Sequence, residues 1–217
     1  MLTLIAAAAA VLLLAGAPLA VAHSGNPNMR SEVTAITPQT GGVTVEVLNY
    51  DDRLELHNTS GKDVVIAGYE GEPYARVRGD GTVQVNTNSK AYYLNDDRYG
   101  DVKVPSGLSK RPRWKELSRS GRFEWHDHRM HWMSKSKPAQ VKDEDAKAHI
   151  FDWRIPITVA GARGQIAGTL DWVPRPGGGL PAGLIWITAA VLIVLCIGVF
   201  LLRRRREDSD REPAEAW

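Results

Sequence analysis

The stretch from Phe151 to Trp172 decides the fold class, and it reads Phe-Asp-Trp-Arg-Ile-Pro-Ile-Thr-Val-Ala-Gly-Ala-Arg-Gly-Gln-Ile-Ala-Gly-Thr-Leu-Asp-Trp. Large apolar residues recur at a period of two in its first half, at Phe151, Trp153, Ile155, Ile157 and Val159, and in its second half at Ile166, Leu170 and Trp172. Because side chains of a strand alternate between two faces, each half predicts a strand with one buried face. Gly161 and Gly164 mark a turn between them, so the stretch predicts a β-hairpin.

Similar signals continue upstream. Short alternating or apolar runs occur at 43–47, 54–56, 64–66 and 83–85, with turn residues between them, and no part of this region keeps a helical period. We therefore expect an all-β, immunoglobulin-like β-sandwich over residues 23–173. Loops are expected at 96–122 and 134–149. The chain has a single Cys, so packing rather than disulfides must hold the domain, and the expected large core residues are Trp125, Trp132, Trp153 and Trp172.

Two apolar segments flank this domain. Residues 1–22 have an apolar run, a helix-breaking Pro18 and a small-residue end at Ala20-Val21-Ala22, which is typical of a secretory signal peptide cleaved after Ala22. An uncleaved anchor is the alternative, because the segment lacks Lys and Arg.

Residues 184–202 are apolar and, at about 1.5 Å per residue, span roughly 28 Å, close to the thickness of a bilayer core. Four arginines follow directly at 203–206 and predict a cytoplasmic end. The sequence therefore predicts a single-pass type I membrane protein with one C-terminal transmembrane helix. Most of the chain is extracytoplasmic, a Pro/Gly linker covers 174–183, and the cytoplasmic tail covers 203–217.

The charge balance and the absence of known catalytic motifs exclude several classes of function. The chain has 27 Lys and Arg against 25 Asp and Glu, which is not the basic footprint of a nucleic-acid-binding protein. The sequence contains no nucleophile elbow, no zinc-protease motif and no P-loop. We therefore expect no enzymatic activity. The acid pair Asp51-Asp52 is interpreted as turn chemistry rather than as a calcium site.

The strongest chemical signal lies at 123–133, Phe-Glu-Trp-His-Asp-His-Arg-Met-His-Trp-Met. An extended chain would place His126, His128 and Met130 on one face, whereas a helix would pair His126 with Met130 and His128 with His131. Imidazole nitrogens suit zinc and copper, and a thioether suits Cu(I), so the cluster indicates copper before zinc. Arg129 in the middle of the stretch argues against a nearby cation.

Cleavage after Ala22 would make His23 the first residue of the mature chain. Its free amine and its imidazole could then chelate Cu(II) as a further ligand pair. Two alternatives to metal binding stay open for the histidines: a structural or interaction role, and a His–Asp dyad in a hydrolase, which would need a nucleophile that the sequence does not supply.

The stretch from Trp125 to Met133 resembles a signature of uncharacterised exported, single-span bacterial proteins of the actinobacterial type. The segments at 153–156 and 168–174 resemble the closing hairpin of the same family, which implies no particular function. A mature His23 start is similar to that of periplasmic copper-resistance β-sandwich domains. We therefore expect a membrane-anchored binding or accessory module that binds copper through its His/Met cluster. The alternative is a metal-free structural or interaction partner of another membrane protein in the cell envelope.

Overall fold

The computed structural model describes residues 25–175 and 182–209, which fall into two compact units, Met1–Pro174 and Arg175–Trp217. Several predictions lie outside the described residues. They are the signal peptide at 1–22 with its cleavage site after Ala22, the ligand His23, linker residues 176–181 and the tail beyond Ser209.

The first unit is an all-β domain of two antiparallel sheets, as the sequence predicts. Its strands between residues 25 and 175 are β1 (Met29–Thr37), β2 (Val43–Leu48), β3 (Arg53–Asn58), β4 (Val64–Ala67), β5 (Pro73–Val77), β6 (Val83–Asn86), β7 (Trp114–Ser118), β8 (Arg122–Trp125), β9 (Ala148–Val159) and β10 (Ala162–Trp172). One sheet has seven strands in the order β1-β10-β9-β4-β5-β6-β7, and the other has three in the order β2-β3-β8. A constant-type immunoglobulin domain divides its strands four and three instead.

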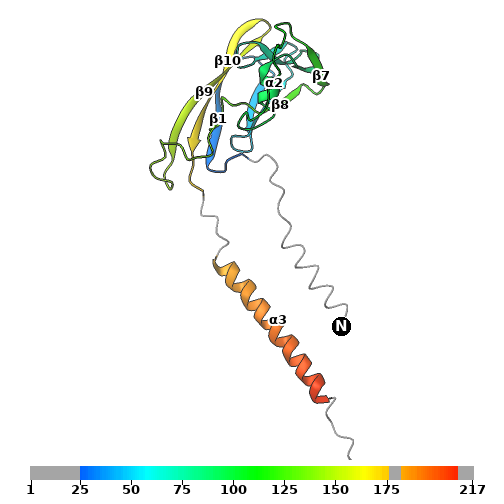
Figure 1. Ribbon diagram of the computed structural model, residues 1–217, viewed down its shortest axis with the longest axis vertical. Coiled ribbons are helices and arrows are strands. Elements are labelled where there is room, and N and C mark those ends of the chain that lie inside the picture. Colours follow the sequence, from blue (N-terminus) through cyan, green and yellow to red (C-terminus); the bar gives the residue numbers. More distant parts are fainter. Residues whose placement is uncertain (1–24, 176–181, 210–217) are drawn as a thin grey trace, which may run out of the picture. The chain divides into compact units, whose positions relative to one another are not determined.

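The hairpin predicted over 151–172 is confirmed as β9 and β10, the longest strands of the domain (Figure 1). Ile155 pairs with Ile166 in an antiparallel register, and the turn passes through Gly161 at a φ of 82°. A positive φ of this size is easily adopted only by glycine, which explains the residue at this position. The alternating apolar residues face the core, where Ile155 and Ile166 are fully buried.

The core lies within the first unit, and all of its buried members fall between residues 29 and 172. Trp125, Trp153 and Trp172 are buried there as predicted, whereas Trp132 packs against the core while partly exposed. Because this unit contains a complete core of its own, a fragment covering 25–175 is expected to fold alone.

Several elements depart from the sequence prediction. The expected loop at 96–122 is wrong in its last third, because β7 and β8 form there. Strand β7 lies at a sheet edge and is largely exposed, so it carries no alternation of apolar and polar residues. A short helix, α2 (Lys90–Leu94), was not predicted either, and Ser89 caps it by accepting a hydrogen bond from the amide of Ala91.

The second unit contains the helix α3 (Ala182–Ser209), which runs beyond the predicted apolar segment into the expected tail. Among the residues that the structure describes, no helix has both the length and the apolar character needed to cross a bilayer. The single span over 184–202 therefore stays a prediction.

Gly168 on β10 provides a test of the hairpin packing. A Cβ atom at this position would lie 2.1 Å from Cζ2 of Trp153, the residue opposite in the register. The same Cβ would lie 2.3 Å from the backbone carbonyl oxygen of Glu32 on β1. We expect Gly168→Ala to lower the free energy of unfolding by about 1–3 kcal/mol, because both the indole and this neighbouring strand must move. Gly41→Ala, where a Cβ would meet nothing within 4 Å, should leave thermal unfolding unchanged. Equal melting temperatures for the two variants would contradict this account.

Candidate metal centre

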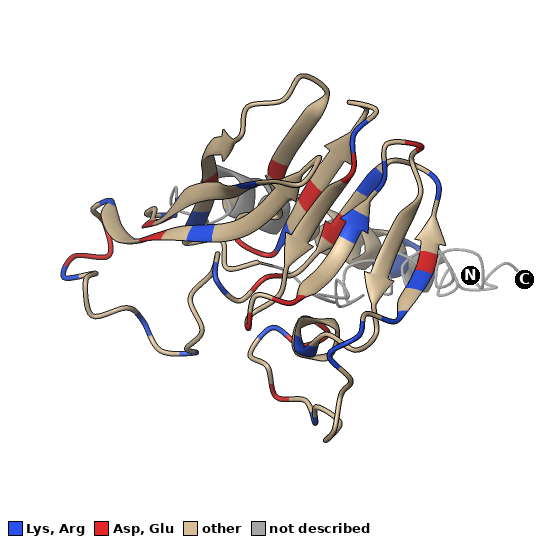
Figure 2. Cartoon of the chain, turned by 90° about the horizontal axis from the view of Figure 1, so that it is seen from above, with Lys and Arg blue, Asp and Glu red and all other residues tan. Residues whose placement is uncertain are grey.

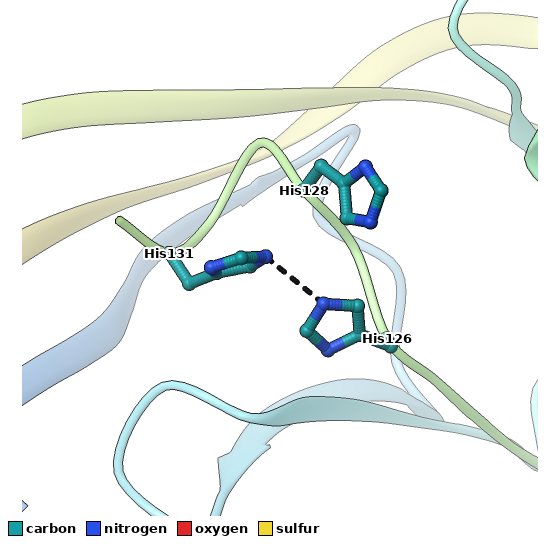
Figure 3. Close-up of side chains that lie close together, drawn as sticks. All are labelled: His126, His128 and His131. Carbon is teal, nitrogen blue, oxygen red and sulfur yellow. Dashed lines mark hydrogen bonds between the residues drawn. The ribbon is translucent and has the colours of Figure 1, made fainter. Parts of the chain in front are cut away.

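The chain turns sharply after β8, and this turn shapes the histidine cluster. The amide of Met130 donates to the carbonyl of Asp127 at 3.1 Å, which closes a tight turn. The segment is therefore neither the extended strand nor the helix that the spacing suggested. The turn reverses the chain so that His126 before it and His131 after it face each other (Figure 3).

The carboxylate of Asp127 holds this turn in place. It is fully buried and accepts hydrogen bonds from Nε1 of Trp125 at 3.0 Å and from the amide of Arg129 at 3.1 Å. The guanidinium of Arg129 binds both of its oxygens, at 2.8 and 2.7 Å. A buried carboxylate is stable only when it is paired in this way, so the ion pair and the turn depend on each other.

The same contacts remove the objection that Arg129 would repel a cation. Its charge is compensated by Asp127, and its guanidinium lies over the ring of Tyr69 at 5.0 Å. It also donates to the carbonyl of Ala67 at 3.1 Å. The expectation drawn from the sequence is therefore wrong, because the basic side chain belongs to a buried ion pair.

His126 and His131 approach each other through their Nε2 atoms, which are 2.9 Å apart. Nδ1 of His126 donates to the carbonyl of Asp52, and Nδ1 of His131 lies 3.1 Å from the carbonyl of Trp132. Because a carbonyl oxygen can only accept, both Nδ1 atoms carry the ring proton. Nε2 of His126 also lies 3.4 Å from the carbonyl of Arg98, which is longer than an ordinary hydrogen bond. In the neutral tautomers that the shorter Nδ1 contacts favour, the two Nε2 atoms present lone pairs to each other.

A shared proton between the two Nε2 atoms would require one ring to be positively charged, and burial opposes that charge. Burial lowers the pKa of His126 below its usual value, although the hydrogen bond to Asp52 acts in the opposite direction. Burial, followed by the charges of His126 and Arg98, lowers the pKa of His131 to about 3. At neutral pH both rings are uncharged and available as ligands.

His128 completes the group from the turn itself. Its ring stacks on Tyr69 with a centroid distance of 5.6 Å, and its Nε2 donates to the carbonyl of Asp97 at 2.9 Å. Its ring stands nearly perpendicular to the other two, with centroids 5.4 Å from His126 and 5.6 Å from His131. Through these contacts Tyr69 and the carbonyl of Asp97 fix the ring beside the facing pair.

One ligand nitrogen from each of the three rings lies within 4.8 Å of the others, so His126, His128 and His131 could hold a metal ion. Met130 was predicted as a further ligand, but it is fully buried and packs as a member of the hydrophobic core. Its position at the bend explains the difference, because the turn sends its side chain inward. His149, on β9, is half exposed and pairs with Asp171 at 3.0 Å, away from this group in the sequence and in its contacts.

The surroundings of the cluster include residues that the sequence did not indicate. Asp51 and Asp52 lie in the turn between β2 and β3, as predicted, but both are also buried, and Arg98 binds Asp51 at 2.7 Å. Burial raises the pKa of Asp51, while the charge of Arg98 acts to lower it. The carbonyl of Asp97 lies 2.9 Å from Nε2 of His128. The carbonyl of Arg98 lies 3.4 Å from Nε2 of His126. No local pattern could have predicted these contacts, because they join segments distant in sequence.

No protein-family model matches the chain, and no curated protein or solved structure is significantly similar to it. The resemblance to exported single-span bacterial proteins therefore stays a prediction. The function must be argued from the geometry of the site.

Gly100 offers a test of how His128 is positioned. It has a φ of +71°, and a Cβ there would lie 3.0 Å from Cε1 of His128. Gly107 has a similar φ of +76°, but a Cβ there would meet nothing within 4 Å. Both Ala variants should lose about 1–2 kcal/mol of stability from the left-handed backbone.

If the cluster holds a metal ion, only Gly100→Ala should also weaken its binding, by at least about tenfold, because the imidazole is displaced. Isothermal titration of both variants with a divalent transition-metal ion measures this difference. Equal affinities for Gly100→Ala and Gly107→Ala would show that the ring is free to move without cost.

Proposed function

We propose that this protein is a membrane-anchored, extracytoplasmic copper-binding module without catalytic activity, and that His126, His128 and His131 hold the ion. The observation that carries the proposal is the close approach of the Nε2 atoms of His126 and His131, which lie 2.9 Å apart. Two lone pairs at this distance repel each other, and a cation between them converts the repulsion into two coordinate bonds. The short distance between the two nitrogens and the burial of the uncharged rings support their assignment as ligands.

The spacing of the facing pair supports copper. With metal–nitrogen bonds of about 2.05 Å, nitrogens 2.9 Å apart subtend about 90° at the ion. An angle near 90° matches the tetragonal arrangement of Cu(II), whereas tetrahedral Zn(II) would need the nitrogens about 3.3 Å apart. Three protein ligands also leave at least one position open, and His126 borders a cavity of about 310 Å³.

A metal-free structural role is the second candidate. It is favoured by the hydrogen bonds of the three rings to backbone carbonyls, those of Asp52, Asp97 and Trp132. In this account the histidines join distant segments of the chain, and the domain is a metal-free structural or interaction partner of another protein of the cell envelope. The two candidates differ in whether the domain retains copper.

Titration of a fragment covering residues 25–175 with Cu(II) distinguishes the candidates. We expect one bound ion with nitrogen hyperfine structure in its electron paramagnetic resonance spectrum. The double variant His126→Ala/His131→Ala should lose at least about tenfold in affinity. His149→Ala is the matched control, since it removes a half-exposed imidazole outside the cluster. Unchanged affinity in the double variant, or no retained copper in the wild type, would leave the structural role as the explanation.

The membrane location is supported by α3. Its apolar side chains from Val191 to Leu202 are exposed, and the four arginines at 203–206 that follow them are exposed as well. Exposed apolar side chains on a helix followed by a cationic cluster suit a lipid environment with the basic end inside.

When the full chain is expressed in bacteria, we expect it to sediment with membranes and to resist extraction with alkaline carbonate. A variant that ends at Arg175 should instead be released in soluble form. Recovery of the full chain in the soluble fraction would contradict the anchored arrangement and, with it, the assignment to the cell envelope.

A further inference from the structure

A groove lies between the short helix α2 and the edge strand β7. It is a cavity of about 540 Å³ lined by Thr87, Asn88, Tyr92, Tyr93, Arg113, Trp114 and Lys115. A second cavity of about 280 Å³ shares Tyr92 and Tyr93 and is also lined by Asp96, Val102 and Lys103. The two cavities therefore border the same two tyrosines.

Hydrogen bonds hold the two sides of the groove together. The side-chain amide of Asn88 donates to the carbonyl of Arg111 at 2.8 Å, and the amide of Thr87 donates to the carbonyl of Arg113 at 2.9 Å. The hydroxyl of Tyr93 donates to the carbonyl of Thr87 at 3.1 Å. The groove is therefore formed before any ligand arrives, as is usual for binding sites that recognise small groups.

The chain that borders the groove is strongly basic. Residues 103–122 contain seven Lys and Arg, all exposed, against the single acid Glu116, whereas the other residues between 25 and 175 have four more acids than bases. Figure 2 shows blue segments along the edge strand and the chain that leads into it. Arg119 and Arg122 pair with Glu116 and Glu55. Within the described part of the chain, the other five form no ion pair, namely Lys103, Lys110, Arg111, Arg113 and Lys115.

We propose that this groove binds an anionic sugar, with Arg113 and Lys115 on its carboxylate or phosphate and the aromatic residues against its ring. Arginine and lysine are suited to both anions, and the five free cations lose no existing partner when such a ligand binds. Tyr and Trp supply an apolar face with a polar edge, which suits a pyranose ring. Thr87 and Asn88 add groups that can bind hydroxyls. The groove shares Tyr92 and Lys115 with the cavity that His126 borders, so the two proposed sites lie next to each other.

Binding of polygalacturonate to the 25–175 fragment tests the proposal, with dextran as the neutral sugar and polyphosphate as the anion without a ring. We expect polygalacturonate alone to bind through both groups. The variant Arg113→Gln/Lys115→Gln should lower the affinity for polygalacturonate at least tenfold. The matched control Lys62→Gln/Lys142→Gln changes exposed positions outside residues 103–122, and its affinity should stay within twofold of the wild type. Raising the salt should weaken binding as well, because the charged contacts are exposed.

Tyr93 separates ring recognition from charge. Tyr93→Leu should weaken polygalacturonate binding at least fivefold, whereas Tyr93→Phe, which keeps the ring, should stay within threefold, and melting temperatures confirm that both variants fold. The sugar assignment is overturned if polyphosphate binds as tightly as polygalacturonate and Tyr93→Leu has no effect. Binding of dextran at equal strength, or no binding of polygalacturonate, overturns it as well. A free monosaccharide such as galacturonate, used as competitor, shows whether one ring suffices or a polymer is required.

Discussion

The buried carboxylate of Asp127 is the interaction on which the histidine cluster depends. Its two oxygens accept hydrogen bonds from the indole N–H of Trp125 and from the backbone amide and the guanidinium of Arg129, and these bonds fix the turn after β8. Breaking a buried ion pair is strongly unfavourable because it leaves an uncompensated charge. The turn is therefore held more firmly than an ordinary surface loop. Because the backbone is fixed, the imidazoles on either side of the turn are also restricted in position. Preorganised ligands of this kind lose little entropy when they bind.

Local patterning explains most of what the sequence predicted correctly about the fold. The hairpin of β9 and β10 and the strands β2, β3, β4 and β6 all carry alternating or apolar runs with turn residues between them. The strands that escaped prediction include β1, β5 and β7. Strands β1 and β7 lie at the two edges of the large sheet, and β7 is largely exposed, so neither has an unbroken buried face. Strand β5 is mostly buried, but it is short and its buried residues do not alternate strictly.

At the site, the sequence supplied the residue types but not their arrangement. The density of histidines between 126 and 131 indicated a metal site, and the structure brings those three rings together. Strand and helix periods both failed, because a tight turn follows neither period. Asp127 acts as the anchor through its near neighbours Trp125 and Arg129, but Arg129 in turn lies over Tyr69, far away in the sequence. Contacts between distant segments leave no trace in residue spacing, and the same is true of the buried carboxylates at 51 and 52.

The tautomers of the facing rings have a consequence for proton exchange. Histidine sites release protons on taking up an ion when their imidazoles are protonated, because only the neutral ring can bind the metal. Here Asp52 and Trp132 accept the hydrogens of His126 and His131 on the far side of each ring, and burial lowers the pKa of both imidazoles. An ion held between the two Nε2 atoms, as we propose, would therefore release no protons from these rings at neutral pH, and its occupancy would depend little on the acidity of the medium above the range where the rings titrate.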